Sequence, residues 1–376
     1  MPRPDHMRAT IRVLIVDDSA LVRQMLHQAL SLDPSIEIVG VARNGVQAVE
    51  MARAFDPDVV TLDIEMPELS GLEALPHIRS VSDARVVMLS SADDTDTTYQ
   101  ALALGAVDFL PKPKGRFTMS VGELSEQLIK TIKTAYRVSP DVVAIDKNAI
   151  ARTMAAIAAR AAEPRVSRAA SKPGSIESGC EIVVAIAAST GGPPALEKVF
   201  RGLESSLAAA VLVVQHLPHG FSASLTRRLS RAGGIDVVEA QEDMALECGR
   251  GYLAPHGVHM VVVGQPPDAR IAFDAFTPPL HGVRPAADLL FYSVAERFGS
   301  QAVGVVLTGM GSDGALGLRA IRDAGGAPIV QDEKTSIVWG MPGSAIKERA
   351  SNRTISIDAI PAEIRRTVRA KEATRE

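Results

Sequence analysis

Residues 11–30 read IRVLIVDDSALVRQMLHQAL, an apolar strand, an acidic turn and a helix that follow one another directly. The same alternation recurs before residue 135, with apolar runs at 37–42, 59–62, 85–89 and 107–110 and helical patterns at 45–54, 71–78, 97–104 and 121–134. Strands and helices of these lengths in alternation predict a parallel sheet with helices on both faces. We expect residues 10–130 to form one doubly wound α/β domain.

Apolar runs return after residue 180 and predict a second, larger α/β domain over residues 180–370. The expected strands are 181–186, 209–215, 259–263, 271–273 and 302–307, and the expected helices are 194–203, 221–232, 286–298, 316–324 and a polar helix from Pro361. We expect a doubly wound, Rossmann-like parallel sheet here too. Residues 135–179 are rich in alanine, arginine, serine and proline, and we interpret them as a linker with one helical pattern at 150–162.

The composition agrees with two folded units and restricts their partners. The chain has 376 residues, of which 46% are hydrophobic and 22% are charged, values that exclude wholesale disorder. Forty Lys and Arg against 44 Asp and Glu give a formal charge of −4. The chain therefore lacks the broad cationic field that binds nucleic acid or anionic lipid.

Targeting signals and cysteines bear on where the protein works. No apolar run approaches the roughly 20 residues that span a bilayer, and the segment MPRPDHMRAT at the N-terminus lacks the apolar core of a signal peptide. Cys180 and Cys248 are too few for a disulfide framework or a four-thiolate zinc site. We expect a cytoplasmic protein with no membrane insertion and with two reduced thiols, and a single bridge between the two cysteines is the alternative.

Charged and polar side chains end successive strands of the first domain. Asp17 and Asp18 follow the first strand, Asp63 follows the third, Ser90 follows the fourth, and Lys112 follows the fifth. Ligands of an open parallel sheet bind at the carboxyl ends of its strands, so we expect these side chains to converge. A cation such as Mg²⁺ would relieve the repulsion among the carboxylates, and Asp63 would then attack a phosphoryl donor. The alternative is that the aspartates only cap a helix or lie in a solvated turn.

Four segments in this order, VLIVDDS, TLDIEMPELSG, VVMLSSA and DFLPKP, resemble the receiver domain of two-component response regulators. The resemblance extends over nearly all of residues 10–130 and implies a flavodoxin-like fold. It also implies a set of residue roles: Asp63 as phosphoacceptor, Asp17, Asp18 and Asp63 around Mg²⁺, Ser90 and Lys112 on the phosphoryl oxygens, and Phe109 as the switch aromatic. For Phe109, a plain core position is the alternative.

Residues 187–194, AASTGGPP, follow the first strand of the second domain and lead into a helix. A serine on a tight strand-to-helix turn presents its hydroxyl at the edge of the sheet, and the following glycines and helix start supply N–H groups for a developing oxyanion. Ser189 is therefore a candidate nucleophile. A helix cap with proline at the helix start and a phosphate cradle are the alternatives for this turn.

A histidine and an aspartate follow two other strands of the same domain, His216 in QHLPHGF and Asp313 in GMGSDG. A doubly wound sheet would bring both to Ser189, where imidazole takes the serine proton and the carboxylate holds the ring. Taken singly, a structural histidine and a turn aspartate are the alternatives. The order Ser, His, Asp differs from that of α/β-hydrolases, and Ala187 replaces the first glycine of their G-x-S-x-G elbow, which disfavours an ordinary lipase or esterase.

The second domain resembles the catalytic domain of chemotaxis protein-glutamate methylesterases in six segments: AASTGGPPAL, VQHLPHGF, YLAPHGVHM, RPAADLLF, LTGMGSDGALGL and QDEKTSIVWGMP. A receiver in front matches the domain order of that family. The resemblance implies hydrolysis of γ-glutamyl methyl esters, and deamidation of selected glutamines, on the cytoplasmic helices of methyl-accepting chemoreceptors. It further implies a chemotaxis histidine kinase as phosphodonor and a catalytic domain without a cofactor.

The same resemblance assigns roles in the second domain: Ser189 as nucleophile, His216 as acid and base, Asp313 as its orienting carboxylate, and Thr190 and Met310 as pocket residues. Two positions depart from the family's usual pattern, because Ala187 stands in place of glycine and Ser312 stands where Asn is frequent. We further expect that the unphosphorylated receiver covers the catalytic cleft and that phosphorylation releases it.

Three other classes of protein are the alternatives. His216 with His219, and His256 with His259, form two H-x-x-H pairs that would suggest a metal hydrolase, but no carboxylate ligand stands in a matching place, and we expect loop or pocket-rim positions for the last three. An interaction protein that only binds the receptor would not need a nucleophile, a base and an orienting carboxylate. A transcriptional regulator would need a basic recognition helix, which we do not find.

Overall fold

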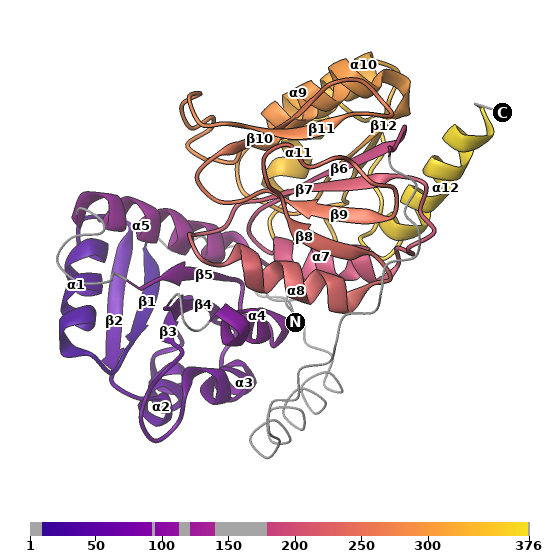
Figure 1. The fold of residues 1–376 in the computed structure, drawn as a ribbon. Coiled ribbons are helices and arrows are strands. Elements are labelled where there is room, and N and C mark those ends of the chain that lie inside the picture. The colour runs from indigo at the N-terminus through magenta and orange to yellow at the C-terminus, as the bar shows by residue number, and fades with distance from the viewer. Residues whose placement is uncertain (1–9, 92–94, 113–120, 140–178, 375–376) are drawn as a thin grey trace. The chain divides into compact units, whose positions relative to one another are not determined.

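The computed structural model describes residues 10–91, 95–112, 121–139 and 179–374. The chain divides into two compact units, Met1–Glu163 and Pro164–Glu376, and each unit has its own central sheet (Figure 1). The helical pattern at 150–162 and residues 140–178 of the expected linker lie outside the described residues.

The first unit contains a five-stranded sheet in the order β2-β1-β3-β4-β5, which is the flavodoxin-like order, and every strand pair is parallel. Its strands are β1 (Ile11–Val16), β2 (Ile36–Ala42), β3 (Val59–Asp63), β4 (Arg85–Ser90) and β5 (Asp108–Pro111). Its helices are α1 (Ala20–Leu30), α2 (Gly45–Phe55), α3 (Gly71–Val81), α4 (Thr95–Ala103) and α5 (Val121–Arg137).

The central strands of this sheet read as nearly continuous apolar runs because helices cover both faces. Every residue of β3 is buried, and so is every residue of β1 except Arg12. Each apolar run gives way to a polar residue where the strand ends. Asp17 directly follows β1, Asp63 and Ser90 end β3 and β4, and Lys112 directly follows β5.

The second unit contains a six-stranded parallel sheet in the order β13-β12-β6-β7-β9-β8 and a separate antiparallel pair, β10-β11. The strands of the sheet are β6 (Val183–Ala188), β7 (Ala210–Gln215), β8 (Asp236–Glu239), β9 (Arg250–Leu253), β12 (Ala302–Val306) and β13 (Ala327–Val330), and the pair consists of β10 (His259–Val263) and β11 (Arg270–Asp274). The helices are α7 (Gly192–Arg201), α8 (Ser222–Ala232), α9 (Ala287–Phe298), α10 (Ala315–Asp323), α11 (Gly340–Lys347) and α12 (Ile360–Ala373).

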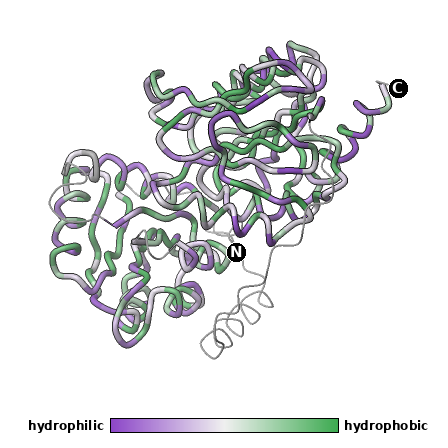
Figure 2. The backbone as a smooth tube through the Cα atoms, viewed as in Figure 1, coloured by the Kyte–Doolittle hydropathy of each residue, from purple (hydrophilic) through white to green (hydrophobic). Residues whose placement is uncertain are grey.

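Helices cover both faces of this sheet. Helices α7, α8 and α12 lie on one side, whereas α9 and α10 lie on the other, where the β10-β11 pair packs against α9 (Figure 1). The strands at the centre of each unit carry mostly hydrophobic residues (Figure 2). The expectation of two doubly wound α/β domains with parallel sheets is therefore confirmed. Among the residues that the structure describes, no helix is both long and apolar enough to cross a membrane.

The sequence patterns missed β8, β9, β13 and α11, and they gave no sign that β10 and β11 stand apart from the parallel sheet. The three missed strands have four residues each, which is too short for a clear apolar period. Two of them are the edges of the sheet, where less of each strand is buried. The residues expected as strands at 259–263 and 271–273 do form strands, and they pair with each other in a two-stranded sheet of their own.

The expectation of two reduced thiols is wrong for this structure. Cys180 and Cys248 form a disulfide, with Cα atoms 5.2 Å apart. Cys180 lies just before β6 and Cys248 just before β9, so both lie near the amino ends of the sheet's strands. A separation of 68 residues along the chain hides this proximity from any local pattern.

Candidate functional site

The acidic pocket of the first unit lies at the carboxyl ends of β1 and β3. One carboxylate oxygen from each of Asp17, Asp18 and Asp63 lies within 4.8 Å of the other two. The Nζ atom of Lys112 lies 2.6 Å from Oδ1 of Asp63 and 3.5 Å from Oδ2 of Asp17. The structure thus brings the three acidic residues and the lysine together at one edge of the sheet.

The protein itself only partly balances the negative charge of the carboxylates in this pocket. Burial, with the added charge of Asp17, raises the pKa of Asp63 to about 6 although the hydrogen bond from Lys112 opposes it. Burial also raises the pKa of Asp17. The buried Oδ2 atom of Asp63 has no hydrogen-bond partner within the described part of the chain. Clustered carboxylates with an unpartnered buried oxygen fit a cation that prefers oxygen ligands, and Mg²⁺ has that preference.

Ser90 and Phe109 contact helix α4 of the same unit. The buried hydroxyl of Ser90 lies 2.5 Å from Oγ1 of Thr98 and donates to the carbonyl oxygen of Ser91 at 3.0 Å. The buried ring of Phe109 packs edge to face on Tyr99, with ring centroids 6.2 Å apart. The serine expected to contact the phosphoryl group and the expected switch aromatic are therefore both joined to α4.

Ser189 directly follows β6, the strand that lies between β7 and β12 in the sheet. Its N–H donates to the carbonyl oxygen of Thr308 at 3.0 Å, and its own carbonyl oxygen accepts from the N–H of Gly192 at 2.7 Å. These bonds hold the turn that leads into α7. The partly exposed hydroxyl of Ser189 has no hydrogen-bond partner among the described residues, so it is available to another group.

His216 and Asp313 form a close pair beside this turn. His216 directly follows β7, and its N–H donates to the carbonyl oxygen of Ala188, the residue before Ser189, at 3.2 Å. Asp313 lies in the loop between β12 and α10, and its Oδ2 atom is 2.8 Å from Nε2 of His216. The Asp313 side chain is 2% exposed, and that of His216 is 13% exposed.

The contact with Asp313 assigns the two ring nitrogens of His216 different roles. An ionised carboxylate only accepts hydrogen bonds, so Nε2 carries the hydrogen and Nδ1 is left as an acceptor. Nδ1 has no hydrogen-bond partner in the described ranges. The nitrogen that can take a proton is therefore Nδ1, whereas in the serine-protease triad it is Nε2.

The carboxylate of Asp313 is held at the N-terminus of α9. Its Oδ2 accepts from the N–H of Ala287 at 2.7 Å, and its Oδ1 accepts from the N–H of Asp288 at 3.0 Å. Burial by itself raises the pKa of Asp313. The hydrogen bond and charge of His216, with these two N–H groups, lower the pKa by more, so the net shift is downward. The positive end of the helix dipole favours the same ionised form.

Gln215, the last residue of β7, is a site residue that the sequence analysis missed. Its buried Nε2 donates to the carbonyl oxygen of Ser189 at 2.9 Å and to that of His216 at 3.0 Å. One amide thus joins the turn that carries the hydroxyl to the residue that carries the imidazole. A polar side chain at the end of the apolar run AVLVVQ, directly before a histidine, is the signal that would have indicated it.

Thr190 and Met310 lie beside the same turn. The carbonyl oxygen of Thr190 accepts from Oγ1 of Thr308 at 3.0 Å. Gly309, the neighbour of Met310, packs so closely on Ser189 that an added Cβ would lie 2.8 Å from the Cβ of Ser189. Both expected pocket residues are partly exposed.

The H-x-x-H pairs have structural contacts. The rings of His219 and His256 lie edge to face with centroids 6.0 Å apart, and Nδ1 of His256 lies 2.8 Å from the carbonyl oxygen of Leu217. His259 is fully buried in β10, where its Nδ1 accepts from the N–H of Ala286 at 3.0 Å. The expectation of a loop or rim position is wrong for His259, because this residue lies on a strand and is fully buried.

A second histidine and aspartate pair, which the local sequence patterns do not indicate, lies next to Asp313. Nε2 of His281 lies 2.8 Å from Oδ2 of Asp288. Asp288 stands in the segment RPAADLLF, and His281 precedes a glycine in a segment that reads as a turn. Neither position carries a local signal for this pairing.

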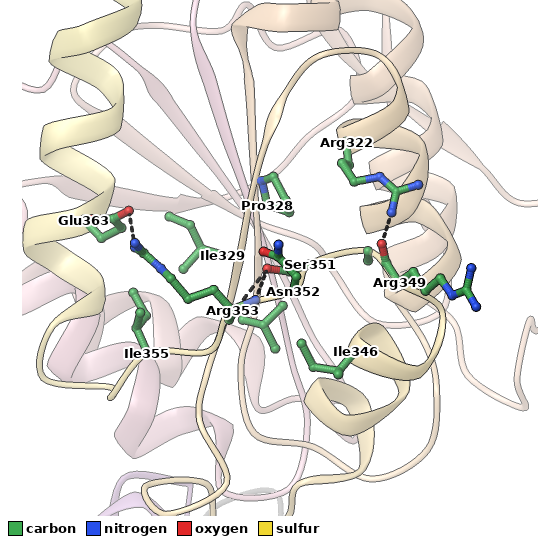
Figure 3. A pocket seen from close by; sticks show the side chains of 12 residues that line it. Arg322, Pro328, Ile329, Ile346, Arg349, Ser351, Asn352, Arg353, Ile355 and Glu363 are labelled. Atoms are coloured by element: carbon green, nitrogen blue, oxygen red, sulfur yellow. Dashed lines mark hydrogen bonds and ion pairs between the residues drawn. The ribbon is translucent and has the colours of Figure 1, made fainter.

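A cavity of about 690 Å³ lies elsewhere in the second unit, between β13, α10, α11 and α12 (Figure 3). Its lining includes three arginines, Arg322, Arg349 and Arg353, and excludes Ser189, His216 and Asp313. Arg353 is paired with Glu363 at 2.7 Å, and Arg322 donates to the carbonyl oxygen of Arg349. The cavity is therefore separate from the candidate active site.

Comparison with known proteins matches both units. Residues 13–120 match the response regulator receiver domain family, and residues 184–364 match the CheB methylesterase family. The chain is 40% identical over 360 residues to the protein-glutamate methylesterase/protein-glutamine glutaminase of Pyrococcus abyssi (strain GE5 / Orsay), over 95% of this chain and 94% of that protein. It is 39% identical to the protein of the same name in Symbiobacterium thermophilum, over 97% of this chain and 99% of the relative. The crystal structure of the Thermotoga maritima CheB methylesterase catalytic domain is 34% identical and covers 49% of this chain and 97% of its own, with a TM-score of 0.48.

The two sheets, the acidic pocket and these matches define a response regulator whose output domain is an enzyme. Its relatives are matched over nearly their whole length. The chain belongs to the CheB-type family of protein-glutamate methylesterase/protein-glutamine glutaminases, the enzymes of chemotaxis adaptation.

Proposed function

We propose that the second unit hydrolyses γ-glutamyl methyl esters, and deamidates selected glutamines, on the cytoplasmic helices of methyl-accepting chemoreceptors. Ser189 is the nucleophile, His216 the acid and base, and Asp313 the carboxylate that orients the ring. The observation that carries the proposal is the 2.8 Å contact between Nε2 of His216 and the buried Asp313, on the strand next to Ser189.

The reaction runs in two balanced halves. Nδ1 of His216 takes the hydroxyl proton of Ser189 while Oγ forms a bond to the γ-carbonyl carbon. The bond from that carbon to the methoxy oxygen then breaks, and His216 returns the proton, so methanol leaves. In the second half, His216 takes a proton from water, the water oxygen bonds to the carbonyl carbon, and Ser189 leaves with the proton. For glutamine, the first leaving group is ammonia.

The turn after β6 offers a limited set of donors to the oxyanion. The N–H of Gly192 is already bonded to the carbonyl oxygen of Ser189, and Pro193 and Pro194 have no N–H. The N–H of Gly191 has no partner in the part of the chain that the structure describes. We assign oxyanion stabilisation to Gly191 rather than to the start of α7, and Thr190 and Met310 line the pocket.

The first unit acts as the switch. Asp63 accepts a phosphoryl group from a chemotaxis histidine kinase, while Asp17, Asp18 and Asp63 hold Mg²⁺. The bound cation offsets negative charge between the carboxylates and the phosphoryl oxygens. Lys112, which already lies 2.6 Å from Asp63, supplies a second positive charge to that group.

Ser90 and Phe109 transmit the effect of phosphorylation at Asp63. To reach a phosphoryl oxygen, the hydroxyl of Ser90 gives up its 2.5 Å contact with Thr98, which loosens α4, and Phe109 follows. Phosphorylation then activates the second unit by releasing a receiver that covers its cleft. We assign the receiver to residues 10–130, the linker to 135–179 and the catalytic domain to 180–370. The protein acts in the cytoplasm, where chemoreceptor helices and the kinase are accessible.

The decisive experiment measures release of labelled methanol from methylated receptor membranes, with and without a small phosphodonor and Mg²⁺. The Ser189→Ala variant should lose at least about 10³-fold in rate while phosphoryl uptake at Asp63 is retained. Ser206→Ala, an exposed serine of the same unit, is the matched control and should keep the full rate. Esterase activity that survives Ser189→Ala would contradict the assignment of the nucleophile.

The regulation of the second unit by the receiver has its own test. Asp63→Asn should abolish phosphoryl uptake and stimulation and keep the basal rate. Residues 180–376 alone should be faster than the unphosphorylated full chain. Equal rates for the two would contradict inhibition by the receiver and leave the hydrolase assignment intact.

A further inference from the structure

A second imidazole–carboxylate pair lies against the pair formed by His216 and Asp313. Nε2 of His281 is 2.8 Å from Oδ2 of Asp288, whose side chain is 1% exposed. One ring nitrogen of His281 and one oxygen from each of Asp288 and Asp313 all lie within 4.8 Å of one another. The reaction derived above uses only the pair of His216 and Asp313 and leaves the other unexplained.

Asp288 is fixed in place by bonds to three elements. At the start of α9, the N–H of Asp288 donates to Oδ1 of Asp313 in the loop after β12. Oδ1 of Asp288 accepts from the N–H of Gly317 in α10 at 2.7 Å. Its other oxygen faces His281. The two buried carboxylates are therefore held next to each other at a set distance, and neither can turn away from the other's charge.

His281 adopts a left-handed backbone conformation, which is uncommon for residues other than glycine. Leu280 and Val283 exchange two backbone hydrogen bonds of 3.2 and 3.0 Å around a two-residue turn. Both central residues are left-handed, with φ of 55° at His281 and 76° at Gly282. Asn-Gly is the pair that this type of turn favours, because asparagine tolerates the left-handed region better than most residues. An imidazole held there, with its ring on a buried carboxylate, points to a role for the side chain.

The imidazole of His281 acts on the charge of Asp288. Burial is the main reason that the pKa of Asp288 is raised, and the charge of Asp313 adds to the effect. An ionised Asp288 without a partner would place a second negative charge beside Asp313, and His216 would then hold its proton more tightly.

The other polar groups around this cluster are few among the described residues. Tyr292 lies further along α9, and burial, together with the charge of Asp288, raises its pKa. Arg319 of α10 is paired with Glu348 at 3.1 Å, and the hydroxyl of Ser312 lies 3.5 Å from Nδ1 of His281. His281 is thus the basic side chain in direct contact with Asp288 among these residues.

We propose that His281 is a positioning residue that compensates the charge of Asp288 and so sets the pH range in which His216 acts as the base. The inference rests on the function proposed above for Ser189, His216 and Asp313. His281 does not touch the substrate. It acts through Asp288 and Asp313.

The test compares the pH dependence of kcat/KM for methanol release in four full-length proteins. His281→Asn removes the basic group that faces Asp288, so the midpoint of the acid limb should rise by about half to one pH unit. Asp288→Asn removes the negative charge and should lower it by a similar amount, while the double variant should return close to the wild-type midpoint. Shifts of equal sign, or no shift in either single variant, would overturn the proposal, because loss of structure alone cannot move the midpoint in two directions.

Two controls separate charge from folding. Asparagine suits the left-handed turn, so any fall in the melting temperature of His281→Asn comes from the buried Asp288 left without its partner and not from strain in the turn. Arg349→Asn is the matched variant, since Arg349 is also left-handed, with φ of 58°, and lines the separate cavity of Figure 3. It should leave the acid limb where it is in the wild type.

A measurement without turnover distinguishes the failure of this inference from failure of the proposed function. NMR titration of the His216 ring in the Ser189→Ala protein, with and without His281→Asn, should show the same upward displacement of its titration. If Ser189→Ala is inactive and the ring titrates identically in both proteins, the charge coupling is wrong and the triad stands. If Ser189→Ala is active, the triad itself fails.

Discussion

The side-chain amide of Gln215 donates a hydrogen bond to the carbonyl oxygen of Ser189 over 2.9 Å. The same amide donates to the carbonyl oxygen of His216 over 3.0 Å. The turn with the hydroxyl and the residue with the imidazole belong to different strands, and this amide connects them inside the protein. Its position determines how closely the nucleophile and its base can be held.

Replacement of Gln215 with leucine should therefore lower kcat by about 10- to 100-fold with little change in KM. It should also cost about 1 to 3 kcal/mol in unfolding free energy, because two buried carbonyl oxygens lose their donor. Steady-state kinetics and denaturant unfolding measure the two effects. A KM effect with unchanged kcat would show that Gln215 binds the substrate instead of positioning the catalytic groups.

Asp313→Asn should reduce kcat by about 10⁴-fold, since an amide no longer holds the His216 ring with an accepting oxygen and a negative charge. The variant should also melt at a lower temperature, because Asp313 accepts two N–H groups at the start of α9. Asp323→Asn, an exposed aspartate at the end of α10, is the control and should change neither quantity. A loss of rate no larger than the loss of folded protein would contradict the orienting role.

The raised pKa of Asp63, about 6 against an ordinary 3.8, links the stability of the receiver to pH. The folded state holds this proton more tightly than the unfolded state, so its contribution to stability is complete below about pH 4 and is lost as the pH rises through about 6. In metal-free buffer, Asp63→Asn should raise the melting temperature by a few degrees at pH 8 and give no gain at pH 4. Glu50→Gln on the exposed face of α2 should show no such difference.

Protons should compete with Mg²⁺ for the same carboxylate. Calorimetric affinity for Mg²⁺ should fall as the pH is lowered through about 6, where Asp63 takes up its proton. Asp63→Asn should bind Mg²⁺ more weakly and lose most of this pH dependence. An affinity that is unchanged between pH 8 and pH 5 would place the cation elsewhere.

Gly191→Ala should unfold more easily by about 1 to 3 kcal/mol and lose most of its activity. Gly191 has φ of 74°, and an added Cβ would lie 2.5 Å from the Cβ of Ile337. Gly257→Ala is a matched control with φ of 90° and nothing within 4 Å of an added Cβ, so it isolates the cost of the left-handed conformation. Equal destabilisation of the two variants would show that packing on Ile337 contributes nothing.

Local patterns predicted much of this protein because the features concerned are local. The apolar run at 11–16 and the helical period at 20–30 are the strand and helix of the structure to the residue. The acidic and basic residues that end the strands of the first unit converge because parallel strands end at one edge of a sheet. The same rule predicted that Ser189 and His216 meet at one edge of the second sheet, and in the structure they directly follow the neighbouring strands β6 and β7.

The contacts between distant side chains depended on the folded chain. His216 and Asp313 are 97 positions apart, and which ring nitrogen faces the carboxylate follows from how the loop after β12 packs on the start of α9. The disulfide, the amide bridge of Gln215 and the pairing of His281 with Asp288 arise in the same way. Hydrophobic periodicity reports which face of an element is buried, whereas these contacts depend on where separate loops meet, and no period along the chain encodes that.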